Sequence, residues 1–193
     1  MQQMYDAGCS AGMYQMQGKS YSFPDLSTTV CPMCRGDFLR KHGFYERNII
    51  EVGFEGQILI RRYICDECGK TVSLLPSFCH PGRAYSTFVI IGVLTEYYVK
   101  MQRVCQAVTS FFSLKEVACS RQLLRHYRHR VEENLKRLVM SITDIYRLKK
   151  PLVTSRGIME GVRQLLSFIK SPQNESLKIF KHTRTTYLSP QPN

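Results

Sequence analysis

Hydrophobic positions follow two different periods along the chain, and the first is that of strands. Runs rich in β-branched and apolar residues lie at Asn48 to Val52 and at Gln57 to Ile64, and such runs predict strands. The stretch Gly53-Phe54-Glu55-Gly56 between them predicts a hairpin connection of four residues. Two flanking stretches can extend the sheet, Phe38 to Tyr45 and Thr71 to Leu75, the latter ended by Pro76.

From Ser86 onward the spacing of apolar residues is that of helices. Ser86 can cap a helix that runs to about Tyr98, and a second helical stretch covers roughly Met101 to Phe112. A third begins at Ser120 and runs to about Tyr146, where apolar residues recur at steps of three or four. That spacing makes one apolar stripe along a helix, formed by Leu124, Tyr127, Val131, Leu135, Leu138 and Ile142.

The helical region contains one ambiguity. Ser113-Leu114-Lys115-Glu116 fits a capping box, so the third helix can alternatively begin at Leu114. Residues 155–170 can form one more short amphipathic helix. These patterns predict an α+β chain in four parts: a flexible N-terminal arm at 1–27, a zinc ribbon at 28–80, a helix-turn-helix-like module at 81–150, and a short helix with a loose tail after Pro172 at 151–193.

The distribution of charge narrows the partners. The formal net charge is +12, of which residues 81–150 carry +8 and residues 31–80 only +1. A basic excess of this kind favours a polyanion, most commonly nucleic acid. The longest apolar stretch, Phe88 to Leu94, is too short for a membrane span of about 20 residues. No export signal is visible, so we expect a reducing cytoplasm, where paired cysteines favour metal over disulfide.

The chemistry of the N-terminal half lies in two cysteine pairs. Cys31 and Cys34, and then Cys65 and Cys68, are each separated by two residues, and a glycine follows closely after each pair. Each pair can hold a metal ion from one tight turn, and four thiolates together suit one tetrahedral structural Zn²⁺. An iron site and a redox dithiol are the alternatives. Four thiolates leave no open position for water, which argues against a catalytic metal.

The remaining cysteines lack ligand spacing. We interpret them as single thiols of the core: Cys9, Cys79, Cys105 and Cys119. His80, beside Cys79, could supply a substitute ligand.

The basic helix that begins at Ser120 carries the second signal. With its apolar stripe facing inward, Gln122, Arg125, His126 and His129 project outward, flanked by Arg121 and Arg128. Arg and Gln can read guanine and adenine in the major groove, and a preceding helix and turn give a helix-turn-helix layout. We therefore predict that DNA contacts Arg121, Gln122, Arg125, His126, Arg128 and His129. The alternative is a solvated basic face on a bundle helix.

The motifs CPMC, HGFYERN, RRYICDECGKTVSLLPSF and SRQLLRHYRHRVEENL occur in that order. In this order the chain resembles uncharacterised bacterial zinc-ribbon plus helix-turn-helix proteins related to insertion-sequence transposases. The resemblance covers about residues 28–140. It implies DNA binding linked to a mobile element, with Cys31, Cys34, Cys65 and Cys68 as ligands and the helix from Ser120 as the DNA-reading element.

A complete transposase is not expected, because strand transfer usually needs three carboxylates that hold two metal ions. After Asp144 only Glu160 and Glu175 remain. The sequence therefore predicts a non-catalytic, zinc-stabilised protein that binds double-stranded DNA in the cytoplasm, in association with the nucleoid. Three alternatives stay open: an accessory module that docks onto a transposase or another copy of the chain, a fragment that needs a catalytic partner, and an RNA-binding protein.

Overall fold

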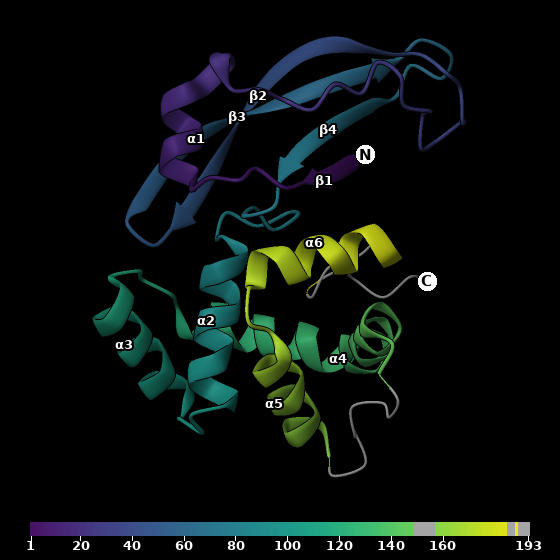
Figure 1. Cartoon of the computed structure of the whole chain (residues 1–193). Helices are drawn as coiled ribbons and strands as arrows, with labels where there is room; N and C mark the ends of the chain where they lie inside the picture. The colour runs from purple at the N-terminus through teal and green to yellow at the C-terminus, as the bar shows by residue number, and fades with distance from the viewer. Residues whose placement is uncertain (149–156, 185–187, 189–193) are drawn as a thin grey trace.

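The computed structural model describes residues 1–148, 157–184 and 188. A four-stranded sheet forms one layer, and most of the helices gather beneath it (Figure 1). The predicted α+β class is therefore confirmed. Among the residues that the structure describes, no helix is both long and apolar enough to cross a membrane.

The sheet contains four strands from the first 76 residues, and the first strand of the chain lies beside the last one. Strands β1 (Gln2–Tyr5), β2 (Leu39–Glu51), β3 (Phe54–Cys65) and β4 (Thr71–Pro76) lie in the order β1-β4-β3-β2. Strand β1 runs parallel to β4, and the other pairs are antiparallel. Pro76 ends β4, as the sequence predicts.

The hairpin is longer and tighter than the sequence indicates. The stretch Phe38 to Tyr45 is no separate strand, because Leu39–Glu51 is continuous across a register shift at Lys41/Gly43. Glu51 pairs with Phe54, so the turn consists of Val52 and Gly53 alone. The predicted four-residue connection is therefore wrong. Gly53 has a φ of 74°, a conformation that glycine adopts at low cost, and this permits the tighter turn.

Two of the helix starts are confirmed by their caps. Helix α2 spans Thr87–Tyr98, and the Ser86 hydroxyl accepts from the N–H of Val89 at 3.2 Å. Helix α4 spans Arg121–Tyr146, and the Ser120 hydroxyl accepts from the N–H of Leu123 at 3.0 Å. In both cases a side-chain oxygen satisfies a backbone donor that the first turn leaves free.

Helix α3 (Val104–Lys115) lies about three residues later than Met101 to Phe112. The alternative start of the third helix at Leu114 is wrong, because Leu114 belongs to the last turn of α3. Glu116 is the C-cap, with a left-handed φ of 56°, and its N–H bonds to the carbonyl of Phe112 at 2.6 Å. Residues Glu116–Ser120 therefore form the whole connection to α4.

The predicted flexible arm at residues 1–27 is folded. Besides β1 it contains helix α1 (Ala11–Gln17) and a 3₁₀ turn η1 (Gly18–Ser20). Tyr14 is fully buried, and its hydroxyl donates to the carbonyl of Leu59 at 2.8 Å. The prediction failed because this segment is held by contacts with the sheet and with neighbouring rings, and its own sequence shows no periodicity.

The predicted loose tail is wrong for the part that the structure describes. Helix α5 (Ile158–Phe168) falls within the predicted 155–170, and α6 (Pro172–Thr183) follows it. Pro172 starts α6, since the missing N–H of proline costs nothing at the first helical position. Residues 149–156, 185–187 and 189–193 lie outside the described part.

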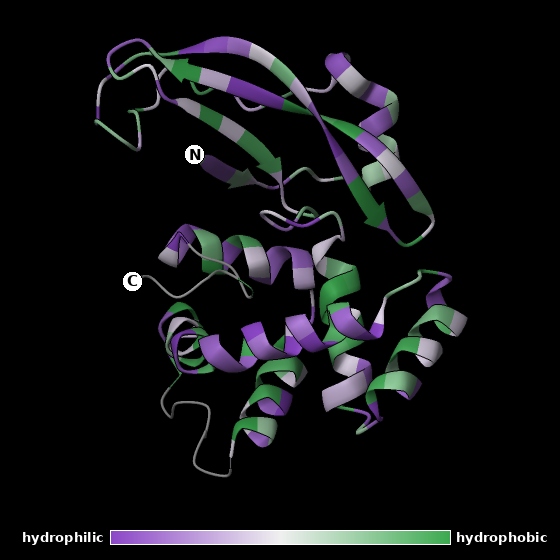
Figure 2. Cartoon of the chain, turned by 180° about the vertical axis from the view of Figure 1, so that it is seen from behind, coloured by the Kyte–Doolittle hydropathy of each residue, from purple (hydrophilic) through white to green (hydrophobic). Residues whose placement is uncertain are grey.

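Buried side chains form two clusters. One lies among α2, α3, α4 and α5, and the other lies between the sheet and the N-terminal segment. Helix α6 joins them, because Ile179 belongs to the first cluster, whereas Leu177 and Phe180 belong to the second. It lies between the sheet and the other helices in Figure 1. In Figure 2 hydrophobic and hydrophilic residues alternate along the same helices, in keeping with one buried and one exposed face.

Candidate metal centre and candidate nucleic-acid interface

The two cysteine pairs form two turns with matching hydrogen bonds. In the first, the N–H of Cys31 bonds to the carbonyl of Gly36 at 2.7 Å, and the N–H of Arg35 bonds to the carbonyl of Cys31 at 2.8 Å. In the second, the N–H of Cys65 bonds to the carbonyl of Lys70 at 3.0 Å, and the N–H of Gly69 bonds to the carbonyl of Cys65 at 2.9 Å. The pairing of β2 with β3 brings the turns together, because Leu39 lies opposite Cys65.

The four sulfur atoms converge. All lie within 4.8 Å of one another, with Cys31 Sγ 3.8 Å from Cys68 Sγ and Cys34 Sγ 3.6 Å from Cys65 Sγ. Four bonds of about 2.3 Å from sulfur to a central ion in a tetrahedron separate the sulfurs by about 3.8 Å. The cluster therefore has the dimensions of a tetrahedral metal site, and these four cysteines can hold a metal ion.

Backbone amides favour the thiolate form of one of the four cysteines. The N–H groups of Cys34 and Met33 lower the pKa of the Cys31 thiol to about 7. At Cys34 the N–H of Gly36 donates to Sγ at 3.4 Å, but desolvation and the neighbouring thiols outweigh it and raise the pKa of Cys34. Hydrogen bonds to the charged form favour the thiolate, which is the form that binds metal. Cys31 and Cys65 are fully buried, so two of the four ligands of a bound ion would belong to the hydrophobic core at the end of β3.

Space and backbone conformation restrict the residues that follow each cysteine pair. A Cβ at Gly36 would lie 2.2 Å from the Glu67 carboxyl carbon, so a larger residue there would require the flexible Glu67 side chain to move away. The Glu67 carboxylate in turn accepts from the N–H of Asp37 at 3.2 Å. After the second pair, Gly69 has a φ of 64°; Arg35 has the same φ after the first pair, at the cost of some strain.

The other cysteines divide by burial. Cys79 and Cys119 are buried, as expected of core thiols, whereas Cys9 is partly exposed and Cys105 is exposed. The core interpretation is therefore wrong for Cys105, which lies on the outer face of α3. Among the described residues, the paired cysteines form the one group of metal-ligating side chains, and His80 is not part of it.

The helix α4 presents four of the six predicted DNA-contact residues to solvent. Arg121, Gln122, Arg125 and His129 are exposed. They follow the cap at Ser120, so they lie over the first three turns of a helix of 26 residues. His129 Nε2 lies 3.2 Å from the carboxylate of Glu133. The structure therefore gathers an Arg, a Gln and a second Arg at the N-terminal end of α4 without internal ion pairs in the described part of the chain.

The other two predicted residues have intramolecular contacts. The Arg128 guanidinium lies over the ring of Tyr97, 4.1 Å from its centroid, and 3.6 Å from the Glu132 carboxylate. Arg128 thus packs α4 against α2. His126 is half-buried, and its Nε2 lies 2.7 Å from Arg83 Nη2. Sequence reasoning missed Arg83, which lies 43 positions earlier, and nothing in the local pattern marks it.

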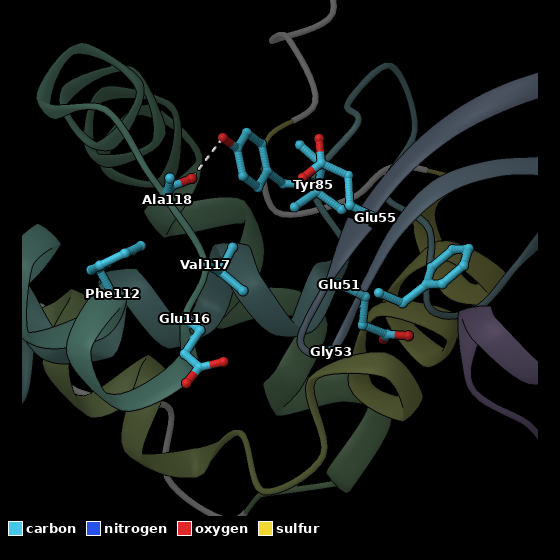
Figure 3. Close-up of a pocket in the computed structure, with 10 residues that line it drawn as sticks. Glu51, Gly53, Glu55, Tyr85, Phe112, Glu116, Val117 and Ala118 are labelled. Carbon is cyan, nitrogen blue, oxygen red and sulfur yellow. Dashed lines mark hydrogen bonds between the residues drawn. The ribbon is translucent and has the colours of Figure 1, made fainter.

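The segment Arg83–Ser86 connects the sheet to this end of α4. Ile50 of β2 exchanges two backbone hydrogen bonds with it, accepting from Ser86 and donating to Ala84, each at 2.9 Å. The Tyr85 hydroxyl donates to the carbonyl of Ala118 at 2.8 Å, in the connection just before α4 (Figure 3). We call Arg83–Ser86 the brace, because it contacts both β2 and the start of α4.

A cavity of about 350 Å³ lies beside the brace, between the hairpin tip and the connection before α4. Figure 3 shows Tyr85, Val117 and Glu116 on its walls, with Glu55 and Glu51 on the side of the hairpin. These carboxylates would repel phosphate. The cavity is therefore an unfavourable place for a phosphate group.

Residues 31–111 match a family described as a domain of unknown function, DUF6431, which covers under half of the chain. The matched segment contains the four cysteines, the brace and α2 with most of α3. It ends before α4. Neither the curated proteins nor the solved structures contain a match to the chain.

Proposed function

We propose that this protein binds double-stranded DNA, that α4 reads it, and that one zinc ion stabilises the sheet without taking part in catalysis. One observation carries the proposal: Arg121, Gln122 and Arg125 are exposed together at the capped N-terminal end of α4. Arg and Gln are the side chains that bond purine edges bidentately in the major groove. A helix N-terminus also favours phosphate.

The arrangement of α3, the connection Glu116–Ser120 and α4 supports a helix-turn-helix reading. The net charge of +8 over residues 81–150 supplies the attraction to the DNA backbone. The resemblance to proteins related to insertion-sequence transposases adds an association with mobile elements to the proposal.

Zinc is the ion we propose for the cysteine cluster. Four thiolates in a tetrahedron suit Zn²⁺, and they leave no position for a catalytic water. Iron in a four-thiolate site is the alternative. Elemental analysis of the purified protein distinguishes them: about one zinc per chain supports the proposal, and one iron with visible thiolate-to-iron absorption contradicts it.

The DNA proposal is tested by fluorescence anisotropy on labelled duplexes over a series of salt concentrations. The parent is expected to bind with an affinity that falls steeply with salt, because lysine and arginine displace counterions. Arg125→Ala should weaken binding by about 1–3 kcal/mol if Arg125 bonds a base. Lys19→Ala is the matched control, since Lys19 is an exposed cation on the N-terminal segment.

The outcomes separate the alternatives. A parent that prefers single-stranded or duplex RNA supports an RNA-binding protein. Binding that Arg125→Ala and Lys19→Ala weaken equally removes α4 as the reading element. The absence of salt-sensitive binding favours an accessory module, for which Phe112 and Leu114, 50% and 61% exposed at the end of α3, offer an apolar contact.

A further inference from the structure

The brace places an additional cation beside the exposed row of α4. Arg83 Nη2 lies 2.7 Å from His126 Nε2. On a helix, residues three and four apart are neighbours, so His126 lies next to Gln122 and His129 on the same face as Arg125. Arg83 therefore adds its guanidinium to this face from a different part of the chain.

The backbone of Arg83 is fixed independently of its side chain. A single Arg47 nitrogen on β2, Nη2, donates to the carbonyl of His80 at 2.6 Å and to that of Arg83 at 2.7 Å. The N–H of Arg83 closes the turn onto His80 at 3.1 Å, with Gly82 at a φ of 70°. The sheet thus holds the Arg83 main chain, so the contact of the guanidinium with His126 is not needed to fix this turn.

The pairing of Arg83 with His126 gives the histidine a role of its own. A guanidinium can only donate, so His126 Nε2 must accept, and the ring must be neutral. Burial lowers the pKa of His126, and the charges of Arg83, Arg130 and His129 lower it further, while Glu133 opposes them. His126 is therefore an uncharged acceptor that positions Arg83, and it does not itself meet a phosphate.

The local charge supplies the reason for a ligand. Arg83, Arg130 and His129 surround His126, and Glu133 is the carboxylate that bonds to the latter two. Arg83 has no carboxylate partner among the ion pairs of the described residues, so a polyanion can supply the negative charge that this guanidinium lacks in the free protein.

Resting on the proposed function, we infer that Arg83 binds a DNA backbone phosphate beside the bases that α4 reads, and that His126 positions it. Phosphate contacts fix the register of a protein on the duplex and carry no sequence information directly. The brace would thus both support α4 and provide one of its phosphate contacts.

The inference is tested on the full-length, metal-loaded protein by anisotropy with one preferred duplex and one unrelated duplex, in a salt series. Arg83→Ala is expected to weaken binding to both duplexes by a similar factor, about threefold to tenfold. It should also lower the slope of log K against log salt by about 0.9, the value of one phosphate contact. Arg83→Lys keeps the charge and should restore most of the slope.

The positioning role of His126 is tested by measuring affinity and salt slope separately. His126→Ala removes the acceptor, so the affinity should fall while the salt slope is retained; His126→Gln keeps an acceptor and should restore the affinity. Thermal unfolding of each variant shows whether the fold is kept, and Arg163→Ala, on α5, is the control for lost surface charge.

The results separate this inference from the proposed function. If Arg125→Ala weakens binding but Arg83→Ala leaves both affinity and slope unchanged, Arg83 makes no phosphate contact and the DNA proposal stands. If Arg83→Ala changes the preference between the two duplexes, it reads a base, and the inference is wrong. If the parent itself binds no DNA, the proposed function fails.

Discussion

The residue His80 shows how burial of one titratable group makes stability depend on pH. It is 1% exposed, its Nδ1 lies 3.1 Å from the carbonyl of Pro81, and its Nε2 has no partner in the described part of the chain. Burial lowers the pKa of His80 to about 4, from an ordinary value of 6.5. The folded protein therefore holds the neutral ring.

The first prediction concerns this ring. Because the pKa is lower in the folded state, its contribution to stability is complete above pH 6.5 and is lost as the pH falls toward 4. The free energy of unfolding should drop by about 3 kcal/mol over this range. His80→Asn keeps a donor for Pro81 but does not titrate, so the difference between parent and variant in urea unfolding should shrink or reverse on acidification. A constant difference from pH 7 to pH 4 would contradict the prediction.

Subtracting the two proteins at each pH also cancels the loss of bound metal in acid. That loss affects both of them, since the cysteines are unchanged.

At the scale of elements, helix α1 is the clearest case of a segment that its surroundings hold. Tyr14 bonds to the carbonyl of Leu59, and its ring lies 4.6 Å from that of Tyr21 and 5.6 Å from that of Phe78. Ser10 caps the helix, but the cap alone cannot stabilise so short a helix. Most of its stability must therefore come from the burial of Tyr14.

The second prediction follows from this burial. Tyr14→Ala should lower the free energy of unfolding by about 3–5 kcal/mol, as is usual for a large buried ring. Met16→Ala, in the same helix at 78% exposure, should change it by less than about 0.5 kcal/mol. Chemical denaturation measures both. Equal effects of the two variants would mean that residues 1–27 are the loose arm that the sequence predicts.

The elements that could be predicted are those with local signals. Ser86 and Ser120 act through donors only three residues away, and the spacing of two residues within each cysteine pair is itself the geometry of a metal turn. Pro172, at the first position of helix α6, is a residue that favours a helix start, but the polar composition of the segment led to the prediction of a loose tail. The contact of Arg83 with His126 could not be predicted, because it exists only once the sheet and α4 are packed.

At the scale of the whole molecule, the two hydrophobic clusters differ in what supports them. The cluster under the sheet includes Cys31 and Cys65, so its packing depends on the cysteine site. The cluster among the helices includes none of the four paired cysteines. A bound structural metal can contribute on the order of 10 kcal/mol to the folding of a small unit. Loss of the ion should therefore affect the two clusters unequally.

The third prediction is a test by hydrogen exchange. Chelation under reducing conditions, or Cys34→Ser, should strip protection from β2, β3 and β4 and leave more of it in the buried half of α4. Cys105→Ser is the matched control: it changes an exposed cysteine outside the site and should leave both metal content and exchange as in the parent. Simultaneous loss of protection in both clusters would show that they unfold as one unit.

The brace also covers part of the outer edge of β2. This strand of 13 residues lies at the border of the sheet, and Ala84 and Ser86 cover its outer side at Ile50. Further along the same side, the bulge at Lys41/Gly43 and the exposed Glu46 and Asn48 discourage a second chain from pairing. Detaching the brace would lengthen the free edge at its most apolar point, so variants that loosen it should be lost first to aggregation during expression.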